Sequence, residues 1–201
     1  RGAGDILGKA QHGTITDIGF ELFCELLEEK VHERRGEELP SFHEVEIRWD
    51  QSSLIPPPYM PMEAQRVTFY KRLAGTREEQ EIDEIEAEMR DRFGQLPEET
   101  VTLLDTYRLR LACQPLRIAG VKKSMNKVRI TFIEPVARDV VDDYQKAAKE
   151  RKEITGVVAD TFDQIVLTLD EEIAQEGALR PLIDYFKELA PAKESAEAAA
   201  S

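Results

Sequence analysis

The fold is decided by the stretch IAGVKKSMNKVRITF, residues 118–132 of the chain. Its second half alternates apolar and polar side chains, which predicts a strand with one buried face. The apolar positions of that strand are Val128, Ile130 and Phe132. Residues 122–126 are mostly polar and predict a hairpin turn, which leads back to a second strand near Ile118 and Val121. A pair of antiparallel strands is therefore the centre of the expected fold.

Helical patterns lie on both sides of this hairpin. Apolar residues recur every three or four positions there, which predicts amphipathic helices, and shorter alternating runs predict further strands. Because helices precede and follow paired strands, the expected fold class is α+β. We expect a helical N-terminal segment, then a compact domain of three helices plus a small, mostly antiparallel sheet with flanking helices. The expected helices are 14–34, 62–74, 76–92, 97–114, 136–148 and 179–189, and the further strands are 45–49, 154–158 and 165–169.

Composition shifts divide the chain into four parts. Residues 1–13 are a glycine-rich loop, 14–40 a connecting helix and linker, 41–190 the main domain, and 191–201 a flexible tail. Within the main domain, three consecutive prolines in residues 55–61 favour polyproline II and predict a stiff, extended connector. The chain opens without a methionine or a signal-peptide core, so we expect it to be a piece of a longer protein.

Composition also limits the possible partners. Hydrophobic residues make up 41% of the 201 residues, enough for a core, so wholesale disorder is excluded. The net charge of -13 repels nucleic acid and acidic membranes, so any DNA contact must be local. No apolar run reaches the roughly 18 residues that a membrane span requires. The two cysteines, Cys24 and Cys113, form no disulfide framework and indicate a reducing compartment, which we expect to be the cytoplasm.

The chain offers no convincing catalytic or metal site. Gly4 and Gly8 enclose three residues where a Walker A loop needs four, and Ala10 stands where that loop needs a hydroxyl. The three histidines are scattered, and neither cysteine has a partner at ligand spacing. The cysteines and the larger aromatic residues fall at core positions. We therefore expect neither a catalytic residue nor a bound metal in this chain.

The helix at 76–92 is the informative feature. Thr76 and Glu79 predict a capping box at its start, and Gly94 is expected to end it. Its apolar stripe is thin and its surface is acidic, which allows two interpretations. The first is a solvated helix face, and the second is a docking face for a partner that carries arginines. The acidic residues are Glu78, Glu79, Glu81, Asp83, Glu84, Glu86, Glu88 and Asp91.

Four sets of residues resemble a known family. Residues 1–8 with 11–13 resemble the end of the translocation motif shared by RecG and the bacterial transcription-repair coupling factor, Mfd. Matches to the coupling factors in particular are found at residues 18–23, at residues 55–61 with 66–73, and at residues 91–97. The resemblance extends to about residue 118. It implies that residues 1–13 form the last part of a loop of the second motor domain. Residues 14–40 would then be a connecting helix and linker, and residues 41–190 the C-terminal regulatory domain.

Members of this family are ATP-driven DNA translocases that remove stalled RNA polymerase and recruit the repair protein UvrA. The resemblance implies that the ATPase motifs lie upstream, so that ATP and magnesium belong to the full-length parent and no cofactor to this chain. It further implies a non-catalytic, autoinhibitory role. The domain would dock on the N-terminal UvrB-like module of the same protein, mask the UvrA-binding surface and repress the motor, with UvrA and RNA polymerase as indirect partners.

The resemblance also assigns residues. Glu88 and Asp91 align with the family's docking contact, and their i, i+3 spacing puts them on one helix face. Arg1 and Gln11 align with the translocation motif, of which this chain holds a remnant. These assignments favour the docking interpretation of the acidic helix. The alternatives are a DNA-motor element and an acidic adaptor for another basic protein, and we expect neither direct nucleic-acid nor membrane binding.

Overall fold

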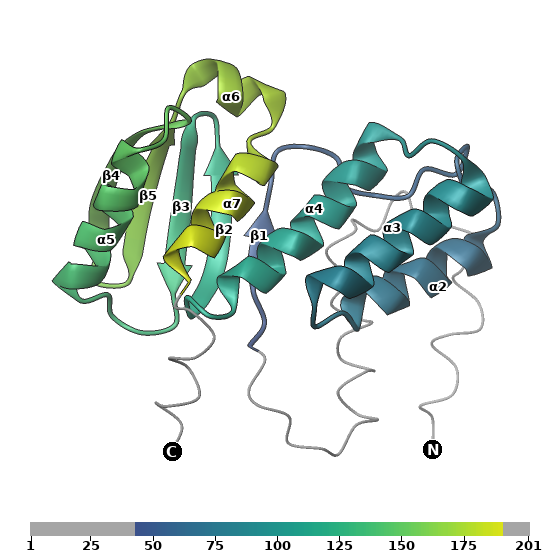
Figure 1. Ribbon diagram of the computed structural model, residues 1–201, viewed down its shortest axis with the longest axis horizontal. Helices are drawn as coiled ribbons and strands as arrows, with labels where there is room; N and C mark the ends of the chain where they lie inside the picture. Colours follow the sequence, from purple (N-terminus) through teal and green to yellow (C-terminus); the bar gives the residue numbers. More distant parts are fainter. Residues whose placement is uncertain (1–42, 191–201) are drawn as a thin grey trace, which may run out of the picture.

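The structure is a computed structural model, and it describes residues 43–190. These residues form a helical half and a sheet half that lie side by side (Figure 1). The predicted helix at 14–34, the motif residues Arg1 and Gln11, Cys24 and the tail 191–201 lie outside the described residues.

The sheet half is built on five strands in the order β1-β2-β3-β5-β4. β1 runs parallel to β2, and the other neighbouring pairs are antiparallel. This arrangement confirms the α+β class with a small, mostly antiparallel sheet. The strands are β1 (Glu46–Arg48), β2 (Ile118–Ser124), β3 (Lys127–Phe132), β4 (Ile154–Thr161) and β5 (Gln164–Leu169).

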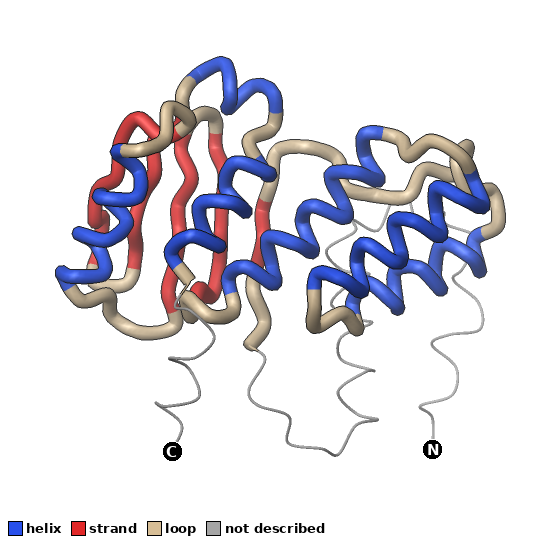
Figure 2. Tube along the Cα trace, viewed as in Figure 1, coloured by secondary structure: helices blue, strands red, loops and turns tan. Residues whose placement is uncertain are grey.

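Three helices form the helical half, and three more accompany the sheet. Two of these, α5 and α7, lie across one face of the sheet (Figures 1 and 2). The bounds are α2 (Glu63–Ala74), α3 (Glu79–Phe93), α4 (Glu98–Cys113), α5 (Arg138–Lys149), α6 (Glu171–Glu176) and α7 (Leu179–Leu189). The sequence did not predict α6, because six residues are too few to establish a helical period. The Asp170 side chain caps it by accepting from the backbone N–H groups of Glu172 and Ile173.

The central hairpin has a tighter turn than the sequence predicted. Residues 122–124 belong to β2, and the chain turns at Met125 and Asn126. The period of two therefore continues through Lys122 and Lys123, which place their side chains on opposite faces of the sheet. Lys123 can point inward because the carboxylate of Asp50 pairs with its ammonium group at 2.5 Å.

The start of α3 was also predicted wrongly. The residue that precedes the helix is Glu78, and its side chain forms a capping box with Glu81. Thr76 serves the preceding helix instead, because its hydroxyl donates to the carbonyl of Leu73 at 2.8 Å. Gly94 follows the last residue of α3 with a φ of 84°, which glycine adopts without strain, and so the predicted end is confirmed.

The proline segment is folded back rather than extended. The backbone N–H groups of Tyr59 and Met60 both donate to the carbonyl of Pro56 at 3.0 Å, which closes a turn. The reversal buries Ile55 and Met60 together in the core of the helical half. The hydroxyl of Tyr59 also donates to the carbonyl of Met89 in α3 at 3.0 Å. Apolar burial on both sides of the prolines therefore overrides their preference for an extended chain.

Each half has its own hydrophobic core, and α4 contributes to both. Leu103, Leu104 and Tyr107 lie in the helical core, whereas Leu109 and Cys113 lie in the core under the sheet. Of the aromatic residues predicted as core, Phe69, Tyr70, Tyr107, Tyr144 and Phe186 are buried. Trp49, also predicted as core on a strand, follows the end of β1 and is half-buried against the sheet core. Burial also raises the pKa of the Cys113 thiol, which fits a packing residue rather than a nucleophile. No helix within residues 43–190 has the length and apolar character to cross a membrane.

Candidate functional site

Helix α3 packs by a narrow stripe and presents its acidic residues around the rest of its circumference. Ile82, Ile85 and Met89 are buried at a spacing of three and four residues. Three apolar side chains are a small contact area for a helix of 15 residues. The arrangement of the acidic side chains therefore decides both how α3 is held and what it offers to a partner.

The side of α3 that faces α4 is neutralised within the chain. The guanidinium of Arg108 on α4 donates to Asp83 at 2.7 Å and to Glu86 at 2.6 Å. It also donates to Asp105 on its own helix at 2.9 Å. Burial alone would raise the pKa of Glu86, but hydrogen bonds from Arg108 and from Arg90 outweigh it and hold that pKa below its ordinary value. Arg108 therefore ties α3 to α4 through charge-assisted hydrogen bonds.

The network continues from the helical half into the sheet half. Asp105 is 5% exposed and accepts a second hydrogen bond, at 2.8 Å, from Arg180 on α7. At the start of α3, Glu79 pairs with Lys187 of α7 at 2.6 Å. Asp105 of α4 and Glu79 of α3 thus each bind a cation of α7, and the contact of Glu79 ties the two halves together beyond their shared helix α4.

Glu88 lies on the opposite side of α3, between two arginines. One carboxylate oxygen accepts from Arg72 of α2, and the other accepts from Arg92, one turn along α3, at 2.5 Å. These hydrogen bonds, from Arg72 first and Arg92 second, lower the pKa of Glu88, so it is ionised at neutral pH. The guanidinium groups of both arginines also lie over the ring of Phe69, at 5.3 Å for Arg72 and 5.7 Å for Arg92.

Asp91 differs from Glu88 in its surroundings. It is exposed, and within residues 43–190 it makes no ion pair. Glu84, two helical turns before Asp91, is exposed as well and accepts a hydrogen bond from Gln80 at 3.3 Å. Glu84, Glu88 and Asp91 follow one another at spacings of four and three residues. They form a ridge along α3, which we call the acidic ridge.

The structure shows a third role for the acidic helix, which neither sequence interpretation included. Six of its eight acidic residues bind groups of the same chain, either in the capping box or in ion pairs. No sequence pattern predicts the long-range pairs, because Arg108 lies 25 residues from Asp83. The i, i+3 pair of Asp105 and Arg108 was visible in the sequence but indicated only a local contact.

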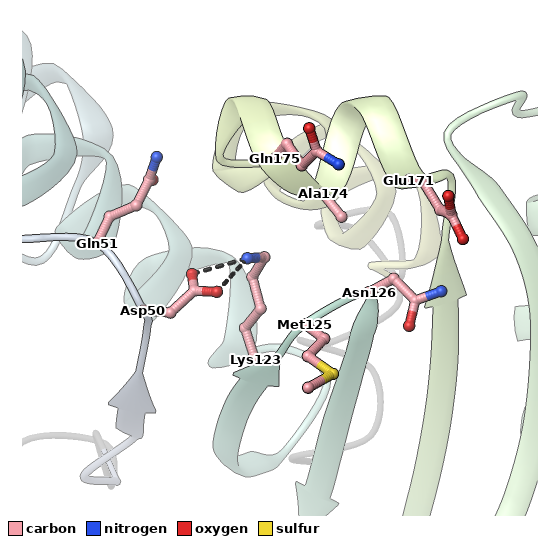
Figure 3. Close-up of a pocket in the computed structure, with 8 residues that line it drawn as sticks. All are labelled: Asp50, Gln51, Lys123, Met125, Asn126, Glu171, Ala174 and Gln175. Carbon is pink, nitrogen blue, oxygen red and sulfur yellow. Dashed lines mark hydrogen bonds and ion pairs between the residues drawn. The ribbon is translucent and has the colours of Figure 1, made fainter.

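A second place with concentrated polar groups is a hollow of about 470 Å³ between the end of β1, the hairpin turn and α6 (Figure 3). Asp50 and Lys123 face each other on one side of it, and Glu171 and Gln175 lie on the α6 side. Lys123 is held by Asp50 and by the ring of Trp49, which lies 5.7 Å from its ammonium nitrogen. The lining contains neither a serine or cysteine nucleophile nor a histidine, so it holds no hydroxyl or thiol nucleophile paired with a histidine base.

A metal site and the glycine-rich segment are the remaining features that the sequence analysis considered. Within residues 43–190, no three histidine, cysteine or acidic side chains are grouped so that they could hold a metal ion. The glycine-rich segment 1–13 lies outside the described part, as do Arg1 and Gln11. Of the four residues that the sequence singled out, the structure therefore places two, Glu88 and Asp91, and puts both on α3.

Comparison with known proteins places this geometry in a family. Residues 50–142 match the TRCF domain. Over 139 residues, or 67% of its length, the chain is 39% identical to the transcription-repair-coupling factor of Escherichia coli (strain K12). Over 141 residues, or 70% of its length, it is 32% identical to that of Bacillus subtilis (strain 168). The chain belongs to the transcription-repair-coupling factors.

This transcription-repair-coupling factor chain spans a small part of its relatives, since each of those two matches covers 12% of the relative's length. Its fold is similar to a crystal structure of the C-terminal domain of a transcription-repair coupling factor, with a TM-score of 0.61 and 18% identity. That match covers 74% of this chain and 94% of the other. The family resemblance and the α+β fold are therefore confirmed. The acidic ridge and Arg108 with its partners Asp83, Glu86 and Asp105 lie inside the matched residues 50–142.

Proposed function

We propose that this chain is the non-catalytic regulatory domain of a cytoplasmic transcription-repair-coupling factor. It docks through Glu88 and Asp91 on the N-terminal UvrB-like module of the same protein. In the docked state it masks the surface that binds UvrA and keeps the motor repressed, and RNA polymerase is affected only indirectly. The observation that carries this proposal is the acidic ridge, where the exposed carboxylates of Glu84 and Asp91 lie on either side of Glu88, on a helix whose other acidic residues are bound within the chain.

The ridge has the chemistry to bind arginines of a partner. Asp91 is exposed and has no cation of its own within residues 43–190, so both of its oxygens can accept a bidentate guanidinium. It lies three residues after Glu88, so a single partner surface can reach both. Because the rest of α3 is bonded to α4 and α7, the ridge is held on a rigid support.

The two arginines at Glu88 do not prevent docking. Arg72 and Arg92 keep 40% and 45% of their side chains exposed, and exposed ion pairs contribute only about 0.2–1 kcal/mol. A partner arginine can therefore replace one of them at little cost. An interface of this kind within one chain stays weak enough for a competing partner to open it.

The test is charge reversal in the full-length protein, with Glu88→Arg and Asp91→Arg combined. We expect a higher basal ATPase rate and tighter UvrA binding, because the closed state loses its electrostatic contact. The matched control is Asp142→Arg with Asp143→Arg, two exposed neighbouring acids on α5 in the other half. If both quantities stay at wild-type values in the Glu88 and Asp91 variant, the chain does not repress through this helix.

A further inference from the structure

The face of the sheet opposite α5 and α7 is a second exposed surface. Figure 1 shows both helices on the same side of the strands. Side chains that point to that side from β3 and β5, such as Ile130 and Leu167, are fully buried. Their neighbours on the other side, including Lys127 and Arg129, are exposed. Among the described residues, no helix covers that other face.

Cations lie next to each other across three strands of this open face. The strand register pairs Arg48 of β1 with Lys122 of β2, and Lys122 with Arg129 of β3. Lys127, two residues before Arg129, adds a fourth cation on the same face. We call Arg48, Lys122, Lys127 and Arg129 the cationic sheet face. Like charges directly opposite each other destabilise a sheet, so the stability of the fold does not explain this row.

Only part of this charge is balanced within the described residues. Arg48 pairs with Glu46 at 2.5 Å, and Arg129 pairs with Asp160. Lys122 and Lys127 are exposed and have no carboxylate partner within residues 43–190. The whole chain has 40 acidic and 27 basic side chains, so acidic partners were abundant. Lys122 and Lys127 therefore leave two neighbouring positive charges unbalanced on the open face, in register with Arg129 and Ser124, and this face attracts anions.

Apolar side chains lie next to the cations, on the neighbouring strands β5 and β4 and at the hairpin turn. Arg129 is paired in register with Val166 of β5, and Val166 with Val158 of β4, which is 62% exposed. At the hairpin turn, Met125 is 84% exposed and has a φ of 55°, in the left-handed region that favours glycine. A hollow of about 410 Å³ lies between these groups, lined by Lys122, Ser124, Met125, Asn126, Lys127, Arg129 and Val166.

We propose that the cationic sheet face docks an acidic segment of a partner protein. Carboxylates of that segment bind Lys122 and Lys127, and an apolar side chain between them contacts Met125 and Val166. This surface belongs to the sheet half, whereas the acidic ridge belongs to the helical half, so the inference does not depend on the proposed function. It gives the domain two docking surfaces of opposite charge.

The composition of the face favours an acidic protein segment over a nucleic acid. Binding without base recognition rests on the number of phosphates neutralised, and two unpaired lysines neutralise few. Bases of a single strand stack on aromatic rings, and the strand residues of this face offer valines instead. The valines and Met125 suit a segment that mixes acidic with apolar residues.

The test is a titration of the isotope-labelled 201-residue chain, followed by backbone amide shifts, with a dodecapeptide of four Glu-Asp-Leu repeats. We expect shifts at Lys122, Lys127 and Arg129, and binding that weakens at least threefold between 50 and 300 mM salt. Lys122→Glu combined with Lys127→Glu should weaken binding at least tenfold. The matched control, Lys149→Glu at the end of α5 with Lys152→Glu in the turn that follows, makes the same change in net charge and should leave binding unchanged.

Folding of the double variant can be checked independently. Glutamate at position 122 stands between Arg48 and Arg129 in the register, so the urea midpoint should not fall. Equal peptide affinity for wild type and double variant, or no shifts on the open face, overturns the proposal. Tighter binding of a twelve-residue oligothymidine to the same amides also overturns it, in favour of a nucleic-acid surface. Glu88→Arg with Asp91→Arg should not reduce peptide affinity, so the two docking surfaces can fail separately.

Discussion

The helical half and the sheet half use charged side chains in opposite ways. In the helical half, α3 buries three apolar residues, and its carboxylates bind arginines and a lysine of the same chain. In the sheet half, four aromatic rings pack edge to face or tilted under the strands, with ring centroids 5.7–6.4 Å apart. There the cations of the outer face are partly unpaired. Where α3 makes little apolar contact, ion pairs within the chain hold it and leave only the acidic ridge for a partner, whereas the sheet keeps unpaired cations on its open face.

The two halves nevertheless share one helix. α4 contributes residues to both cores, and its Asp105 accepts from Arg108 beside it and from Arg180 on α7. A change deep in either core should therefore be felt by the other half. This coupling makes the contrast between the halves testable by single substitutions.

The largest effect is expected from Phe186→Ala in the sheet half. Phe186 is fully buried, and its ring contacts Tyr144 and Tyr185. Loss of its apolar area and the cavity left behind should lower the free energy of unfolding by about 3–5 kcal/mol. The measurement is urea unfolding, followed both by the fluorescence of Trp49, the single tryptophan, and by far-ultraviolet circular dichroism.

Coincident midpoints in that experiment would show that both halves unfold as one unit. A second transition in the circular dichroism, at the wild-type midpoint, would instead mean that the helical half unfolds by itself. α4 would then not couple the two cores.

A smaller effect is expected from Arg108→Met, which removes the charge of the network but keeps an apolar stem. Arg108 is 11% exposed, and its loss leaves Asp83 and Glu86 without their α4 cation and Asp105 with one partner instead of two. We expect the free energy of unfolding to fall by about 2–3 kcal/mol in urea titrations at pH 7.

Arg90→Met is the matched control for that change. Arg90 pairs with the same Glu86 but keeps 59% of its side chain exposed, so its loss should cost less than about 0.5 kcal/mol. Equal losses for the two variants would mean that burial does not strengthen the network, and the helical half would then owe its stability to its apolar stripe.

The sequence predicted the parts of the molecule in which one period runs without interruption. The alternation in residues 128–132 gave β3 correctly, and the three-and-four spacing of Ile82, Ile85 and Met89 gave the buried side of α3. The errors fall where a distant contact overrides a local preference. Thr76 bonds backward to α2, and the prolines turn because Ile55 and Met60 are both buried.

The two surfaces were predictable to different degrees. The family resemblance assigned Glu88 and Asp91 to a docking contact. It did not indicate the arginines that bind Glu88, because Arg72 lies on α2 and meets Glu88 only in the folded chain, while Arg92 lies one turn along α3. For the cationic sheet face a local signal did exist, since Lys127 and Arg129 alternate with buried residues of β3. The row itself depends on strand register, which brings together Arg48, Lys122 and Arg129 from a span of 81 residues. The sequence alone does not predict that register.

The smallest effect is expected from Glu86→Gln, and its sign depends on pH. Because the pKa of Glu86 is lower in the folded protein than its ordinary value of 4.5, the ionised carboxylate stabilises the fold. That contribution is fully present above about pH 4.5 and is lost as the pH falls through the lowered pKa. The free energy of unfolding of the wild type should exceed that of the variant by about 1 kcal/mol at pH 7, and the difference should shrink towards zero in urea titrations at progressively lower pH.

Glu84→Gln, which removes an exposed carboxylate from the same helix, is the control and should leave the free energy of unfolding at pH 7 unchanged. A gap for Glu86→Gln that stays constant down to acid pH would mean that packing of the side chain, and not its charge, connects α3 to α4.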